Sequence, residues 1–261
     1  MIGTRAQHIL ISACSTLLCV VPAQAALISV DASVFNQDAS LITFSEVPDQ
    51  TGNPVFIPGP NAGGSRPTVS TGGLFSGQAV DFNCAGCVTG SPSDGLSLVG
   101  NAQPVFTTLV PGSADEAILS GSPRFNGPIS ILFSIGVNAA GFIGSFFDAP
   151  GSHVLTAFDR QGNLLGSVEN GLTGAQFLGL ADDSGANSIA GIQFGRAGDN
   201  SAGFALDDLR FGQAGQISLP TSEVSVAEPR GLAWLALAII AGMGCLRRRK
   251  SAGPGISPAA L

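Results

Sequence analysis

The chain is poor in charge and in the larger aromatic side chains. Charged residues make up 11% of its 261 residues, against about 25% in an ordinary globular protein. It has one Trp, no Tyr and a single Lys, Lys250. With 11 basic and 18 acidic residues the net charge is −7, which argues against nucleic-acid binding, because phosphate contacts need Lys and Arg. Gly is plentiful while Glu, Lys and Met are scarce, so a long helical bundle is also disfavoured.

The first 25 residues have the pattern of a secretory signal peptide. Arg5 is the one fixed positive charge before an apolar run over residues 9–21, and Ala23-Gln24-Ala25 gives the small-residue cleavage pattern. We therefore expect signal peptidase to cleave after Ala25 and the rest of the chain to be exported. The alternatives are a buried first helix and a lipoprotein signal ending at Cys14. That second signal would leave an apolar run shorter than export requires.

A second apolar segment, residues 231–246, lies near the other end and carries the only Trp, Trp234. At 1.5 Å per residue it would be about 24 Å long, a marginal length for a membrane span. A basic cluster, Arg247, Arg248, Arg249 and Lys250, follows it. Such clusters stay on the cytoplasmic side, so we expect an outside domain, one transmembrane helix over 231–246 and a cytoplasmic tail over 251–261. A buried helix of a soluble domain is the alternative.

This end of the chain, residues 223–250, resembles the PEP-CTERM sorting signal of exopolysaccharide-producing bacteria. Glu228 and Pro229 match its Pro-Glu-Pro motif, and Arg247 to Arg249 match its basic end, although position 227 is Ala and a tail follows the cluster. The resemblance implies recognition by an exosortase, cleavage near Glu228 and Pro229, a transient inner-membrane anchor, and a final location at the cell surface or in the extracellular matrix.

The segment between the two ends, residues 26–222, has the composition of a β-protein. It holds 16 acidic residues, five Arg and no Lys, a net charge of −11, together with all 16 Phe. Short apolar runs are separated by turn residues; the expected strands are 41–44, 79–82, 96–99, 105–110, 129–135, 141–147, 154–158, 164–168, 188–194 and 204–211. We expect an all-β fold, a single jelly-roll-like β-sandwich.

Residues 41–211 resemble the lectin-like or carbohydrate-binding-like β-sandwich found in exported proteins with this sorting signal. The resemblance rests on ITFSE (42–46), FIGSFF (142–147), AFDRQGNLLG (157–166) and FALDDLRF (204–211). It implies a structural calcium ion held by Glu46 in the first strand and Asp207 in the last. Strand alternation would place Asp207 on one face with Leu209 and Phe211, where a bare carboxylate is costly. In the alternative, Asp207 caps a strand end or faces solvent after a bulge.

Two cysteines remain in the exported segment, Cys84 and Cys87. An even number in an exported domain favours a disulfide. The spacing is also compatible with redox catalysis or half of a zinc site, but no thioredoxin-like unit and few other ligands are visible.

Catalytic patterns are weak. His153 is the only imidazole in the exported segment, and we expect it to be a polar surface residue. The neighbouring carboxylates Asp115 and Glu116 would suit glycoside hydrolysis, yet the absence of Tyr and Trp removes the usual sugar-stacking rings and weakens both hydrolysis and sugar binding.

The sequence thus favours a non-enzymatic, exosortase-sorted protein of the cell surface or the exopolysaccharide and biofilm matrix. A calcium-stabilised carbohydrate-binding module is the first alternative and a secreted hydrolase the second. The expected partners are signal peptidase, an exosortase, exopolysaccharide and, transiently, the membrane.

Overall fold

The computed structural model describes residues 26–58, 66–84, 86–93, 95–100, 103–110, 112–113, 115–197 and 203–220. Over these ranges the chain is all-β and antiparallel, and its only helices are two 3-10 turns, η1 (Ala32–Val34) and η2 (Ala214–Gln216). None of the described helices is long and apolar enough to span a membrane. The contacts divide the chain into a unit over Met1–Leu219 and another over Pro220–Leu261; the description below concerns the first.

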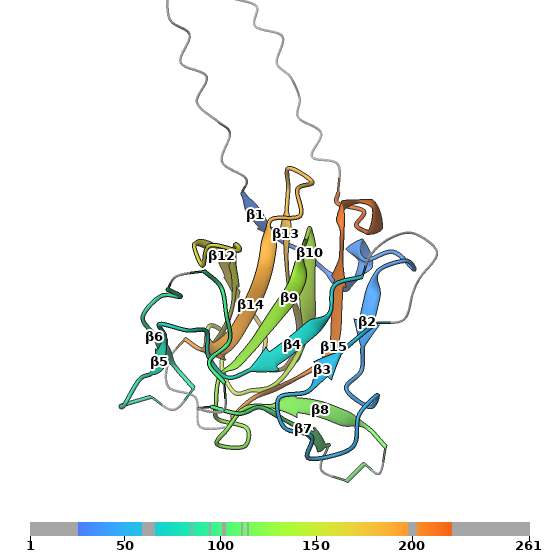
Figure 1. The fold of residues 1–261 in the computed structure, drawn as a ribbon. Helices are drawn as coiled ribbons and strands as arrows, with labels where there is room; N and C mark the ends of the chain where they lie inside the picture. Colours follow the sequence, from blue (N-terminus) through green and yellow to red (C-terminus); the bar gives the residue numbers. More distant parts are fainter. Residues whose placement is uncertain are drawn as a thin grey trace, which may run out of the picture. The chain divides into compact units, whose positions relative to one another are not determined.

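Two sheets make up the fold (Figure 1). The seven-stranded sheet, here sheet A, has the order β1 (Leu27–Ser29), β13 (Gly174–Asp182), β10 (Ala139–Phe147), β15 (Ala205–Gly212), β8 (Ala117–Ser120) and β7 (Phe106–Leu109). Its seventh strand, β2 (Ser40–Ile42), pairs with β15. The six-stranded sheet, here sheet B, has the order β12 (Leu164–Glu169), β11 (His153–Phe158), β14 (Ile189–Arg196), β9 (Ile129–Val137), β4 (Val69–Gly72) and β3 (Val55–Phe56). The strands β5 (Ala79–Val80) and β6 (Val88–Thr89) form a separate pair.

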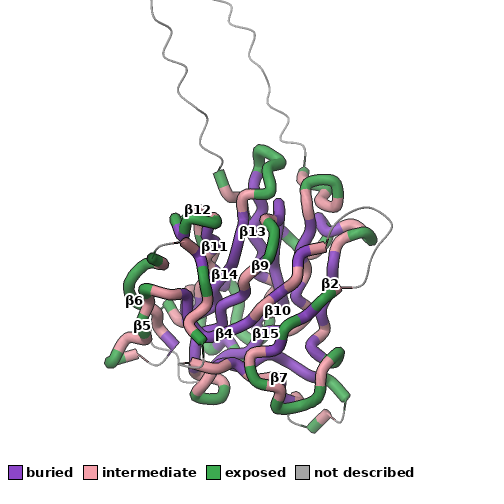
Figure 2. The backbone as a smooth tube through the Cα atoms, in the orientation of Figure 1, coloured by how far each residue is buried: buried purple, intermediate pink, exposed green. Residues whose placement is uncertain are grey.

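Sheets A and B share one apolar core. The ring centroids of Phe142 on sheet A and Phe194 on sheet B lie 4.7 Å apart, and those of Phe211 and Phe133 lie 5.2 Å apart. All four rings are buried, and Figure 2 shows the buried backbone running through the central strands of both sheets. This shared core is consistent with the expected β-sandwich, and the all-β prediction is confirmed.

Most of the expected strands are present, because alternation of apolar and polar residues fits a sheet with one buried face. One expected strand is absent, and several observed strands were not expected. Residues 96–99 form no strand, only a single bridge between Leu98 and Phe75, and here the apolar residues Phe75 and Leu96 pack in a small cluster with Phe158. Six observed strands were not expected. Five are short, and the sixth is the nine-residue β13, whose glycines interrupt the alternation; they are β1, β3, β4, β6, β8 and β13.

The N-terminal segment covers one half of the outer face of sheet A. Val30, Val34 and Phe35 form a second apolar cluster with alanines of β10 and β13. The sheet makes room for it with glycine: a Cβ on Gly179 would meet the Val30 carbonyl oxygen at 2.9 Å, closer than real Cβ contacts allow. This second apolar cluster does not extend over the other half of the outer face, toward the end of β10.

The first and the last residues of the β-sandwich lie close together, at the same end of sheet A. Leu27 in β1 pairs with Asp182, and Ala139 pairs with both Ala181 and Gly212. The backbone N–H of Ser218 donates to the carbonyl of Val34 at 2.8 Å. In Figure 1, β1 and the turn after β15 accordingly lie at the top, while β7 and β8 lie at the opposite end.

Candidate functional site

Asp207 lies on the outer face of sheet A, because a β-bulge reverses the alternation of β15. The register with β10 advances two residues, Gly141 to Ile143, while β15 advances three, from Arg210 to Asp207. Asp208 takes up the extra residue with φ 49°, a left-handed conformation that costs energy outside glycine. The expectation that Asp207 shares a face with Leu209 and Phe211 is therefore wrong.

The burial along β15 shows the same reversal. Leu206, Leu209 and Phe211 are fully buried in the shared core, whereas Asp207 and Asp208 are only partly buried. The position of Asp207 matches the alternative in which a bulge turns the carboxylate away from the core. The side chain of Asp208 forms an ion pair with Arg210 at 3.7 Å.

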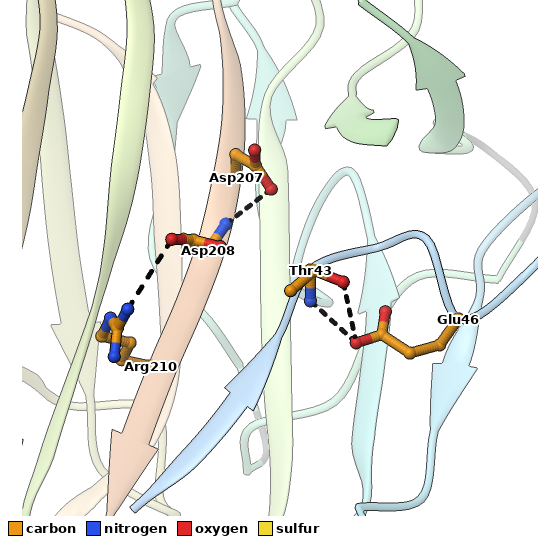
Figure 3. Close-up of polar contacts among 5 residues, drawn as sticks. All are labelled: Thr43, Glu46, Asp207, Asp208 and Arg210. Carbon is orange, nitrogen blue, oxygen red and sulfur yellow. Dashed lines mark hydrogen bonds and ion pairs between the residues drawn. The ribbon is translucent and has the colours of Figure 1, made fainter. Parts of the chain in front are cut away.

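Glu46 lies in the loop that continues β2 along the same edge of β15. Its Oε1 accepts hydrogen bonds from the backbone N–H of Thr43 at 2.9 Å and from the Thr43 hydroxyl at 3.2 Å. Figure 3 shows the Glu46 carboxylate folded back onto Thr43, while Asp207 accepts the N–H of Asp208 at 2.7 Å. Among the described residues no hydrogen bond joins Glu46 to Asp207, but the two carboxylates act on each other electrostatically.

Calcium chemistry fits these two residues in kind but not in number. Carboxylate oxygens are the ligands that Ca²⁺ prefers, and it takes six to eight of them. The described part of the chain brings no three His, Cys, Asp or Glu side chains together in an arrangement that could hold a metal ion. Carbonyl oxygens and water would have to complete a shell around Glu46 and Asp207.

Asp207 also lines an open pocket of about 510 Å³ on the uncovered half of sheet A. Glu116 contributes a second carboxylate, and most of the remaining lining is apolar: Val110, Ile118, Ile143, Phe146, Gly174 and Ala175, with Ser145. Burial, together with the neighbouring charges of Asp208, Glu116 and Glu46, raises the pKa of Asp207 to about 6, against the lowering effect of the hydrogen bond from the Asp208 N–H.

A second bulge shapes the rim of this pocket. The register between β10 and β13 shifts between Ser145 and Phe147, and Phe146 takes up the extra residue with φ 71°. The Phe146 ring is 38% exposed and meets the ring of Phe125 edge-on, with centroids 5.5 Å apart. The guanidinium of Arg124 lies 5.2 Å from the centre of the Phe125 ring. From the sequence, Asp207 and Glu116 were candidates for two different sites, and nothing brought them together with Phe146, because the resemblance assigned the run FIGSFF to the fold.

The two cysteines lie at the turn between β5 and β6. The Sγ atoms of Cys84 and Cys87 are at disulfide-bonding distance and their Cα atoms are 5.4 Å apart. The Cys87 N–H also donates to the Cys84 carbonyl at 3.1 Å. This geometry agrees with the expected disulfide, which would pin the turn.

His153 is not the surface residue that was expected. It is fully buried at the start of β11, with ring centroids of Phe147 and Phe204 each 4.9 Å away. Burial, together with the charge of Arg196, lowers its pKa to about 4, against a raising effect of Asp148. Its Nδ1 lies 3.0 Å from the hydroxyl of Ser152. A neutral imidazole enclosed by rings suits packing better than proton transfer to a substrate, so the geometry adds nothing to the hydrolase hypothesis.

The other expected site residues lie outside the described part of the chain. These are the processing position Ala25 and the sorting residues Glu228, Pro229, Arg247, Arg248 and Arg249. Of the pair considered for glycoside hydrolysis, Glu116 lines the pocket on sheet A and Asp115 does not.

Comparisons of the chain with protein-family models, with curated proteins and with solved structures found no match.

Proposed function

We propose that this chain is an exported, exosortase-sorted protein of the cell surface or exopolysaccharide matrix, and that its jelly-roll-like sandwich acts by binding rather than by catalysis. The observation that carries the proposal is the placement of the chain ends. Residues 26 and 218 both lie at one end of sheet A, and the open pocket lies toward the other. Both ends of the described domain therefore lie away from the pocket.

The start of the sandwich supports cleavage after Ala25. The backbone nitrogen of Ala26 lies 3.2 Å from Oδ1 of Asp183, and the Asp183 N–H donates to the Ala26 carbonyl at 3.2 Å. Cleavage would turn this nitrogen into an ammonium group beside a carboxylate, a favourable contact of up to about 1 kcal/mol at an exposed site.

The sorting step is tested by mass spectrometry of the protein from cells and from the medium. We expect a mature N-terminus at Ala26 and a C-terminus near Glu228. In a Glu228→Ala, Pro229→Ala variant the C-terminus should stay at Leu261 in the membrane fraction. A Glu223→Ala variant serves as the control and should be processed normally. An unprocessed Leu261 in all three proteins would refute sorting.

A calcium-stabilised carbohydrate-binding module is the second candidate, and the open pocket with its two carboxylates favours it. A glycan array decides between this candidate and a purely structural protein. Reproducible binding to one class of sugar supports the module, and no binding to any class refutes it.

Glu46 and Asp207 would hold the calcium ion, whose role there is to neutralise two neighbouring carboxylates and tie the Thr43–Glu46 loop to β15. A ligand that binds only the folded state must stabilise it. We therefore expect excess calcium to raise the melting temperature of the protein relative to the chelated protein. The shift should be lost in Glu46→Gln and kept in the exposed control Glu169→Gln. Equal melting temperatures with calcium and with chelator would end the calcium proposal.

A further inference from the structure

The pocket on sheet A is set apart from the rest of the surface by its construction. The floor of the pocket contains paired residues of neighbouring strands. One such pair is Ile143 on β10 and Asp207 on β15. Ser145 and Ala175 form another pair. The volume of about 510 Å³ falls within the range of about 300–1,000 Å³ that is usual for small-molecule sites.

Two bulges shape this pocket, and both have a residue other than glycine in the left-handed region. The bulge at Asp208 turns Asp207 onto the pocket face, and the bulge at Phe146 lies at the rim. Bulges often re-aim side chains beside functional sites, and backbone strain concentrates where function requires a fixed geometry. The strand pairing itself therefore determines where the Asp207 carboxylate and the Phe146 ring lie.

The charge of the pocket is unbalanced. Its lining contains two carboxylates and no Arg, Lys or His. Within the described ranges neither Glu116 nor Asp207 forms an ion pair, and the Asp207 carboxylate accepts one hydrogen bond, from Asp208. A partly buried carboxylate without a cation is costly, so a cationic group entering the pocket would gain a charge-assisted hydrogen bond.

We propose that this pocket binds a protonated amino sugar unit of a polysaccharide, with the ammonium group against Asp207 and Glu116 and the apolar face of the ring against Ile143 and Phe146. The inference rests on the carbohydrate-binding function of the second candidate above, with the Asp207 carboxylate free of calcium, and specifies its ligand class. It places the site on the face of sheet A that the N-terminal segment leaves open.

The chemistry favours an amine over a metal ion or a neutral sugar. An ammonium group is satisfied by one to three acceptors, whereas calcium needs six or more oxygens, and the lining offers two carboxylates. An apolar floor beside two carboxylates suits an ammonium group attached to a sugar ring, because the C–H face of that ring can pack on Ile143 and Phe146. A neutral sugar would leave the carboxylates without a counter-charge.

The test is a titration of the full-length protein in detergent, with chelator present, against three probes. They are the hexamer of β-1,4-linked glucosamine, the hexamer of N-acetylglucosamine, and hexalysine. The first two share ring and linkage and differ in the ammonium group; the third carries charge without a sugar ring. Glu116→Gln and Asp207→Asn keep the side-chain shape and remove the charge. Glu169→Gln removes one exposed carboxylate elsewhere and is the matched control.

We expect the glucosamine hexamer to bind, and each pocket variant to weaken it by roughly tenfold or more, as loss of a hydrogen bond to a charged group implies. Glu169→Gln should bind like the unchanged protein. Equal binding of the acetylated hexamer would overturn the inference and leave a carbohydrate-binding function standing. Equal binding of hexalysine, or no binding of any probe, would overturn it as well. The sorting experiment reads out the chain ends and is independent of all these results.

Discussion

Two side chains, His153 and Asp207, are held in the neutral form by burial over a pH range in which they would be charged in the unfolded chain. Burial lowers the pKa of His153 from 6.5 to about 4 and raises that of Asp207 from 3.8 to about 6. The signs are opposite. Between pH 6.5 and 4, His153 is protonated in the unfolded chain but neutral in the folded protein. Lowering the pH over this range therefore destabilises the fold. Between pH 6 and 4, Asp207 is protonated in the folded protein but ionised in the unfolded chain. Lowering the pH over this range therefore stabilises the fold through Asp207.

We expect Asp207→Asn to separate the two effects. At pH 7 the variant should be more stable than the unchanged protein by about 1–2 kcal/mol, because the disfavoured charge is gone. The gain should shrink as the pH falls through 6 and vanish near pH 4, where Asp207 is protonated in the folded protein. Urea unfolding at several pH values, without calcium, measures this difference. If the difference in unfolding free energy between the variant and the unchanged protein did not change with pH, the ionisation of Asp207 could not be its cause.

The faces taken by these two residues could not be read from the sequence. Strand alternation placed Asp207 with Leu209 and Phe211, but the bulge at Asp208 separates them. His153 looked like a polar residue at a strand edge, yet its ring packs against Phe147 of sheet A, Phe194 of sheet B and Phe204, which directly precedes β15. Both outcomes depend on the register between strands that are distant in the sequence.

At the scale of elements, the N-terminal segment depends on glycines in the sheet beneath it. A Cβ at position 179 would meet the ring of Phe177 at 2.7 Å and the carbonyl oxygen of Val30 at 2.9 Å. We expect Gly179→Ala to lower the free energy of unfolding by about 1–3 kcal/mol, the usual cost of overpacking. The segment around Val30 should also become more open to proteolysis.

Gly171 provides the matched control for that substitution. A Cβ there meets no atom within 4 Å, so Gly171→Ala should leave stability unchanged or slightly raised. Urea midpoints of the two variants give the comparison. Equal loss in both, or no loss at position 179, would show that the close approach is unimportant.

Strand prediction succeeded where one apolar face alternates with a polar one, as in β9, and failed where packing overrides the pattern. Ile135 belongs to the expected alternation of β9 but is 38% exposed, because the ladder with β14 is irregular between Leu132 and Val137. β13 contains Gly179, against which the N-terminal segment packs. Its place in sheet A between β1 and β10 depends on partners that lie at least 27 residues away in the sequence.

At the scale of the whole molecule, acidic residues greatly outnumber basic residues between positions 26 and 222. The 16 acidic and five basic residues within 26–222 give −11, and this repulsion opposes the compact state. We expect the urea midpoint to rise as sodium chloride is increased from about 10 to about 300 mM, since the Debye length shortens over that range. Chelator should be present so that calcium plays no part. A midpoint that does not rise with salt would show that the charges are too far apart to matter.

The sequence by itself determined the composition-dependent properties: an acidic, Phe-rich, all-β chain with two cysteines between positions 26 and 222 and an apolar segment near each end. These depend on residue counts and short-range alternation. The tertiary structure alone decided which half of sheet A is covered, where the bulges fall, and that Asp207, Glu116 and Phe146 meet at one pocket. The physical reason is that a one-residue change in register moves a side chain to the other face of a sheet, and register is set by partners far along the chain.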